Sequence, residues 1–123
     1  EIFHENINFN LVEKNFENNF FKFEDIVEKI KSTSNNFFLK ENNKFYDIIL
    51  IDGSHEFEDV LSDAENSLKV INENGIIIFD DYNWFHYKNE KLNPAHAINI
   101  FLKNNLGKFE ILFVGMILIL KKI

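Results

Sequence analysis

The middle of the chain alternates two kinds of hydrophobic pattern. Nearly continuous apolar runs at residues 46–51 and 76–79 are typical of strands that are buried on both faces of a sheet. Between them, apolar residues recur every three or four positions from Phe57 to Ile71, which predicts an amphipathic helix that ends at Asn74-Gly75. Strands joined by such a helix are parallel, with a right-handed crossover. The pattern therefore predicts an α/β fold.

The flanking segments add further elements. Apolar positions about one turn apart, at Phe9, Val12, Phe16 and Phe20, predict a helix in residues 1–23, whereas residues 26–34 fit either a strand or a continuation of that helix. Asn93-Pro94 has the form of a helix start. Residues 109–114 and 116–120, separated by a glycine, are typical of two strands in a hairpin.

Composition fits one domain over residues 1–123, with 46% hydrophobic and 27% charged residues. The net charge is −7 and every basic residue is a lysine, which disfavours a nucleic-acid partner. No cysteine is present, so a metal would need oxygen or imidazole ligands. The longest apolar stretch is about half the roughly 20 residues of a spanning helix. We therefore expect no membrane partner and a cytoplasmic location.

Acidic residues follow both predicted strands. Asp52 ends the first apolar run, and Asp80 and Asp81 end the second. The carboxyl ends of parallel strands share one sheet edge, where ligands bind, and a cation such as Mg²⁺ would relieve the repulsion between clustered carboxylates. His55 is within reach of the same edge and has the chemistry of a general base. Spacing alone leaves open that the acids only terminate strands and that His55 is a cap or faces solvent.

A loop rich in aromatic residues follows the second acidic pair. It contains Trp84, Phe85, His86 and Tyr87. Such rings either close over a ligand as a lid or cover the core, and the pattern does not distinguish these roles.

The motifs at the two strand ends resemble those of a known family. The segment that carries the resemblance is FYDIILIDGSHEFEDVLSDAENSLKVINENGIIIFDDYNW, residues 45–84. It is similar to the later half of class I S-adenosylmethionine-dependent methyltransferases, in particular the group with IDGSH and FDDY strand ends. The NPAHAINIFL segment and the final hairpin also fit. The resemblance implies a Rossmann-like methyltransferase sheet, mostly parallel, with a C-terminal antiparallel hairpin.

The resemblance also implies roles for individual residues. In metal-dependent O-methyltransferases of this kind, the matching acids hold Mg²⁺; here they are Asp52, Asp80 and Asp81. His55 would be the base, S-adenosylmethionine the cofactor, and a small molecule the methyl acceptor. Asp52 is also assigned to cofactor binding, together with Ser34, which stands where many relatives contact the adenine.

Two features of the family have no counterpart in this sequence. These are the GxGxG loop after the first strand and the acid that binds the ribose; the four glycines all lie elsewhere, at positions 53, 75, 107 and 115. The chain also opens without Met or a leader sequence. We therefore expect a C-terminal portion that lacks the N-terminal strands and is inactive alone. Its exposed sheet edge would permit association into oligomers.

Three functions are compatible with these observations. The first is S-adenosylmethionine-dependent O-methylation of a sugar or another small metabolite. The second is a non-catalytic Rossmann-like domain that uses the acidic edge to bind a cation or a protein partner. The third is a different Mg²⁺ enzyme, such as a phosphotransfer domain; against it, no acid lies two residues from Asp52 and no lysine follows in a recognisable phosphate site.

Overall fold

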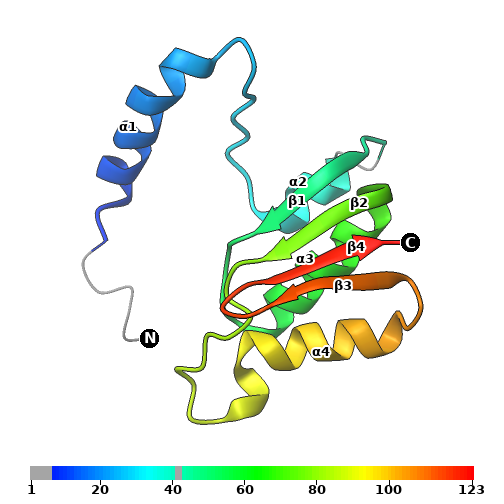
Figure 1. The fold of residues 1–123 in the computed structure, drawn as a ribbon. Coiled ribbons are helices and arrows are strands. Elements are labelled where there is room, and N and C mark those ends of the chain that lie inside the picture. Colours follow the sequence, from blue (N-terminus) through cyan, green and yellow to red (C-terminus); the bar gives the residue numbers. More distant parts are fainter. Residues whose placement is uncertain (1–6, 41–42) are drawn as a thin grey trace. The chain divides into compact units, whose positions relative to one another are not determined.

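The computed structural model describes residues 7–40 and 43–123, which belong to two compact units (Figure 1). The first unit ends at Lys31, and the second is Ser32–Ile123. All the site residues predicted from the sequence lie in the second unit. None of the helices in the described ranges has both the length and the apolar character that a bilayer crossing requires.

The first unit contains helix α1, Phe9–Phe20, and the 3₁₀ turn η1, Phe21–Phe23. The helix begins at Asn8, whose side-chain oxygen accepts a hydrogen bond of 3.2 Å from the backbone N–H of Leu11. Such a cap satisfies one of the N–H groups that a helix leaves free at its start. The helix predicted in residues 1–23 is therefore confirmed for Phe9–Phe20, and the first six residues of that segment lie outside the described ranges.

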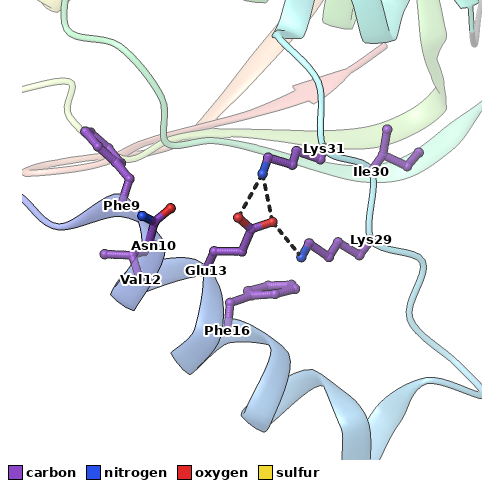
Figure 2. Close-up of a pocket in the computed structure, with 8 residues that line it drawn as sticks. All are labelled: Phe9, Asn10, Val12, Glu13, Phe16, Lys29, Ile30 and Lys31. Carbon is purple, nitrogen blue, oxygen red and sulfur yellow. Dashed lines mark hydrogen bonds and ion pairs between the residues drawn. The ribbon is translucent and has the colours of Figure 1, made fainter.

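Residues 27–33, most of the segment 26–34 for which a strand or a continued helix is predicted, are neither, so both alternatives are wrong there. The lysines of this segment instead pair with α1: Lys29 Nζ lies 2.8 Å from Glu17 and Lys31 Nζ lies 2.8 Å from Glu13. Figure 2 shows Glu13 between the two lysines, beside a groove of about 450 Å³. A β-strand requires backbone hydrogen bonds to a neighbouring strand. The contacts of Lys29 and Lys31 involve side chains only, so they do not form a strand.

The second unit is built on a four-stranded sheet of order β1-β2-β4-β3. The strands are β1 Tyr46–Ile51, β2 Ile71–Phe79, β3 Phe109–Val114 and β4 Leu118–Lys122. β1 and β2 are parallel, and β4 runs antiparallel to both β2 and β3. The Rossmann-like α/β fold with a C-terminal antiparallel hairpin is confirmed.

Three helices accompany the sheet. They are α2 Ser34–Lys40, α3 Phe57–Val70, which connects β1 to β2, and α4 Pro94–Asn104, which is preceded by the 3₁₀ turn η2 Glu90–Leu92. α3 and α4 pack on the same face of the sheet, and the core lies between them and that face (Figure 1). Its members are Val60, Ala64, Ile71, Ile77, Phe79, Ala97, Ile98, Phe101, Leu118 and Leu120.

Helix α3 ends earlier than the sequence predicts. It stops at Val70, and Asn74-Gly75 lies inside β2, where the register with β1 shifts. Asn74 has a φ of 64°, and a Cβ on Gly75 would lie 2.7 Å from the side chain of Ile71. The Asn-Gly signal therefore marks an irregularity within a strand rather than the end of the helix, because a bulge also requires positive φ and close packing.

Two other expectations for the strands need correction. β1 is not buried on both faces: Ile48 is 65% exposed and Leu50 is 58% exposed. The reason is that β1 is an edge strand of the described sheet and that α3 and α4 cover only the opposite face. β4 begins at Leu118 rather than Met116, because residues 115–117 form the turn.

We predict that Phe101→Ala destabilises the second unit by about 3–5 kcal/mol. The Phe101 side chain is fully buried, with its ring centroid 6.2 Å from that of Phe79 and 5.4 Å from that of Phe109. Urea unfolding measures the loss. The matched control is Phe45→Ala, because Phe45 is 61% exposed and should change stability little. Equal losses in the two variants would contradict this account of the core.

Candidate functional site

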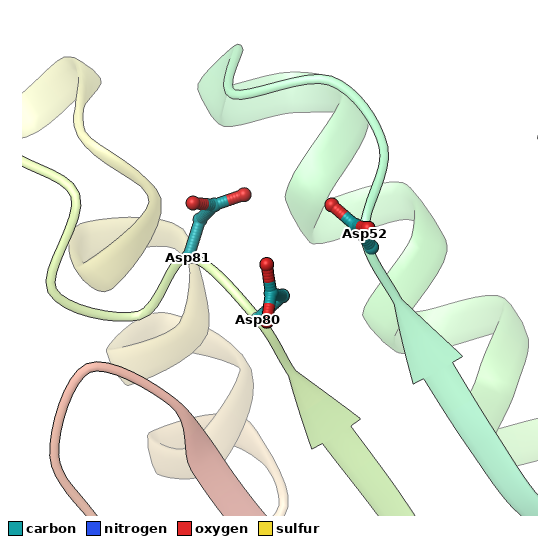
Figure 3. A group of neighbouring side chains, drawn as sticks. All are labelled: Asp52, Asp80 and Asp81. Atoms are coloured by element: carbon teal, nitrogen blue, oxygen red, sulfur yellow. The ribbon is translucent and has the colours of Figure 1, made fainter.

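The three predicted acidic ligands lie together at the carboxyl ends of β1 and β2. Figure 3 shows Asp52 at the end of β1, and Asp80 and Asp81 at the end of β2. One carboxylate oxygen from each lies within 4.8 Å of the others. The Asp80 N–H donates a 3.1 Å hydrogen bond to the Ile51 carbonyl, which holds the two strand ends level. The parallel pairing of the strands thus brings these acids together, as predicted.

His55 belongs to the same group. Its Nε2 lies 3.0 Å from Oδ2 of Asp81, and both side chains are about one-third exposed. The alternative that His55 caps the helix does not hold, since the N-cap of α3 is Glu56. The loop that follows Asp52 therefore carries His55 back over the end of β2, where its imidazole contacts an acid of the neighbouring strand.

The aromatic loop covers this histidine. The Trp84 ring stacks on the His55 ring with centroids 4.5 Å apart and planes inclined by 13°. A turn in which the Trp84 N–H donates to the Asp81 carbonyl, at 3.1 Å, brings the indole back toward the strand ends. The sequence left the role of this loop open. In the sequence, the only signal for the stacking of Trp84 on His55 is the position of Trp84, three residues after Asp81.

Tyr87 joins the loop to the start of α3. Its hydroxyl donates a 2.7 Å hydrogen bond to Oε1 of Glu56, the residue after His55. This bond, with smaller contributions from partial desolvation and from the Glu56 charge, raises the pKa of the Tyr87 hydroxyl. The tyrosine therefore stays protonated as a hydrogen-bond donor at neutral pH.

Ser34 lies outside the acidic group. It is the first residue of α2, and its hydroxyl donates a 3.3 Å hydrogen bond to Oδ2 of Asp63 on α3. Both residues line a polar pocket of about 400 Å³ that also includes Ser54, from the loop between Asp52 and His55. The loop at residues 52–55 thus connects the two predicted sites, because Asp52 belongs to the acidic group and Ser54 lines the same pocket as Ser34. The pocket's full lining is Ser32, Thr33, Ser34, Asn35, Ser54, Asp59, Ser62 and Asp63.

Asp63 is the acid in this pocket whose pKa is perturbed. Burial raises the pKa of its carboxyl group, the hydrogen bond from Ser34 opposes that effect, and the nearby charge of Asp59 adds to it. Because the pKa is higher in the folded chain than in the unfolded chain, ionising Asp63 costs stability. The cost is fully present above the folded pKa and disappears as the pH falls below the ordinary value of 3.8.

We therefore predict that Asp63→Asn raises the melting temperature at neutral pH, because it removes a partly buried charge and keeps an oxygen that can accept from Ser34. The gain should vanish below pH 3.8, where Asp63 is protonated in both states. Glu65→Gln, an exposed carboxylate on the same helix, is the control and should give no such pH-dependent gain. Thermal melts across pH measure the difference; an unchanged or lower midpoint at neutral pH for Asp63→Asn would contradict the assignment.

The acidic group has the right donors for a hard divalent cation. All three candidate ligands offer carboxylate oxygen, which Mg²⁺ prefers over nitrogen or sulfur. Asp52 and Asp80 are exposed and Asp81 is partly exposed, so their free oxygens can be approached by a hydrated ion and a substrate. The residues present therefore fit the metal that the sequence motifs imply.

Comparison with known proteins agrees with this geometry. A family model described as "Methyltransferase domain" matches residues 3–82. The chain belongs to this methyltransferase family. Class I members use S-adenosylmethionine as the methyl donor, and the two strand ends described above lie within or at the end of the matched region.

Two further similarities extend the comparison. A crystal structure described as a "putative caffeoyl-CoA O-methyltransferase" from Staphylococcus aureus superposes with a TM-score of 0.59 at 15% identity, over 93% of this chain. At that identity the similarity shows the fold alone. A mimivirus protein, "Uncharacterized protein R132" of Acanthamoeba polyphaga mimivirus, is 33% identical over 52 residues, which is 42% of this chain. The chain spans 58% of the bacterial protein and 24% of the viral one.

Proposed function

We propose that this domain takes part in S-adenosylmethionine-dependent O-methylation of a hydroxyl on a sugar or another small metabolite. In this proposal Asp52, Asp80 and Asp81 hold Mg²⁺ and His55 is the general base. The observation that carries it is the 3.0 Å contact between His55 and Asp81, within a group of three carboxylates at the strand ends. A base beside a cation site is the arrangement that deprotonation of a hydroxyl requires.

The His55–Asp81 contact determines which ring nitrogen can act as the base. An ionised carboxylate only accepts hydrogen bonds, so in the neutral ring the hydrogen lies on Nε2 and is donated to Asp81. Nδ1 is then the nitrogen with a free lone pair. When Nδ1 takes a proton, the ring becomes positively charged, and the adjacent Asp81 carboxylate stabilises that charge.

The reaction then needs little more from the chain than positioning. Bound Mg²⁺ would supply positive charge that favours ionisation of the acceptor hydroxyl. His55 accepts the hydroxyl proton, the oxygen forms a bond to the sulfonium methyl carbon, and the carbon–sulfur bond breaks to leave S-adenosylhomocysteine. The residues at the strand ends orient the acceptor for this in-line attack, which is the main contribution that proximity makes to a rate.

The cofactor side of the proposal rests on Ser34 and Asp52. The Ser34 hydroxyl uses its hydrogen toward Asp63, so its oxygen lone pairs are the groups that could accept from the adenine amino group. Asp52 is two residues before Ser54, which lines the same polar pocket as Ser34. The loop at residues 52–55 would thus contribute to both sites: Asp52 would bind the metal, and Ser54 would line the pocket for the cofactor.

We predict that His55→Ala and Asp81→Asn each lower methyl transfer by about 100-fold or more, since a positioned base contributes roughly 10²–10⁴. The measurement uses radiolabelled S-adenosylmethionine and the protein as its gene encodes it, screened against hydroxylated small molecules. Both variants should still bind S-adenosylmethionine.

Matched substitutions control for nonspecific effects. His96→Gln changes a histidine that packs against Phe57, and Asp47→Asn changes an aspartate of β1 that accepts a hydrogen bond from Asn72. Both should retain transfer. Normal turnover in His55→Ala and Asp81→Asn would overturn the assignment of the base. Cation binding without any methyl transfer to the acceptors tested would favour the non-catalytic binding domain.

A further inference from the structure

The rings of the aromatic loop support one another around His55. Trp84, stacked on His55, meets Tyr87 edge-on with centroids 5.0 Å apart and His86 edge-on at 4.8 Å. Edge-to-face contacts of this kind add stabilisation beyond simple burial. The indole is therefore held from one side by its neighbours in the loop while its face covers the imidazole.

The loop itself is tied down on both sides of Trp84. The Asn83 N–H donates to the Met116 carbonyl at 3.2 Å, which attaches the loop to the β3–β4 turn. At Tyr87, the buried Asn93 side chain accepts from the backbone N–H at 3.1 Å and donates to the backbone carbonyl at 3.3 Å. Only the backbone of Tyr87 is used in that contact, so its ring and hydroxyl are directed by other partners.

The partner of the hydroxyl is Glu56, and this closes a ring of contacts. Glu56 follows His55 in sequence, Tyr87 bonds to Glu56, Tyr87 packs against Trp84, and Trp84 stacks on His55. Glu56 is the N-cap residue of α3, and its backbone carbonyl accepts from the Val60 N–H at 3.0 Å, but its side chain makes no capping hydrogen bond. Its carboxylate is thus directed to the loop rather than to the helix that it begins.

We propose that Tyr87 and Trp84 are positioning residues for His55. The Tyr87–Glu56 hydrogen bond holds Trp84 against the imidazole, and the stacked indole keeps Nε2 of the imidazole directed at Asp81. The ring is then held in the tautomer with Nδ1 as the proton acceptor. This inference rests on the proposed function only for its consequence for catalysis; the positioning of the ring is a separate physical claim.

The central test compares two tyrosine-to-phenylalanine changes in the same loop. Tyr87→Phe removes the hydroxyl that bonds to Glu56, and Tyr82→Phe removes one that donates to Asn99 of α4 at 3.0 Å. Trp84 is the single tryptophan of the sequence, so its fluorescence reports this loop alone. We expect acrylamide quenching of Trp84 to increase in Tyr87→Phe and to stay at the wild-type value in Tyr82→Phe.

The tautomer of His55 gives a readout that a merely structural role would not change. Nitrogen-15 spectra of the histidine rings distinguish the protonated from the unprotonated nitrogen of a neutral ring, and His55→Gln assigns the signals. We expect the wild type and Tyr82→Phe to show one tautomer, with hydrogen on Nε2. In Tyr87→Phe the His55 signals should move toward the average of the two tautomers.

A second variant protects the test against a folding defect in Tyr87→Phe. Glu56 is exposed, and Glu56→Ala removes the same hydrogen bond from its other end without changing an aromatic ring. It should reproduce both changes, and combining it with Tyr87→Phe should add nothing. Wild-type quenching and a single tautomer in Glu56→Ala and in a folded Tyr87→Phe would overturn the proposal.

Activity separates failure of this inference from failure of the proposed function. In the protein as its gene encodes it, Tyr87→Phe should lower kcat for methyl transfer by about 10- to 100-fold, the size of a small misplacement of a reacting group, with little change in KM. If the tautomer shifts but His55→Ala leaves transfer unchanged, the positioning is real and His55 is not the base. If His55→Ala abolishes transfer while Tyr87→Phe changes neither tautomer nor kcat, the base is confirmed and its positioning by Tyr87 is refuted.

Discussion

The parallel pairing of β1 with β2 is the constraint on which the site depends. Ile51 stands opposite Phe79 in the ladder, and the Asp80 N–H bonds to the Ile51 carbonyl just beyond it. That register brings the acids after the two strands to the same level, although a whole helix separates them in sequence. A shift of one residue would turn each side chain to the other face of its strand and separate the group.

Bringing three carboxylates together creates an electrostatic cost that the surroundings must offset. Exposure to water offsets part of it, and the imidazole of His55 contacts Asp81 directly. The same proximity that is unfavourable for folding would serve the function that we propose, in which a cation and the His55 base act on one hydroxyl. In the positioning that we propose, Trp84 packs on His55 and is held there by the hydrogen bond of Tyr87 to Glu56, which adds no further charge to the acidic group.

The features predicted correctly from the sequence are those that a short run of neighbouring residues determines. Apolar runs that end in acids located β1, β2 and the group at their ends, while the IDGSH and FDDY motifs pointed to the methyltransferase fold. Prediction from the sequence failed where a signal has two structural meanings: Asn74-Gly75 suits the end of a helix and equally a bulge within β2. Contacts between segments far apart in the sequence, such as Trp84 on His55 and Ser34 on Asp63, have no local pattern, because they depend on how several segments pack. The exposure of Ile48 likewise depends on which elements flank β1, and the run of apolar residues does not encode that.

We propose above all that the carboxyl ends of β1 and β2 form one cation site beside His55. Paramagnetic broadening by Mn²⁺, used in place of Mg²⁺, tests it directly through the amide signals of the chain. We expect substoichiometric Mn²⁺ to broaden the signals of Asp52, Asp80 and Asp81 first, and excess Mg²⁺ to restore them. The signals of Glu110 and Lys122, near the opposite end of the β3–β4 ladder, should stay sharp. Broadening distributed over the acidic surface, or centred on other carboxylates, would contradict it.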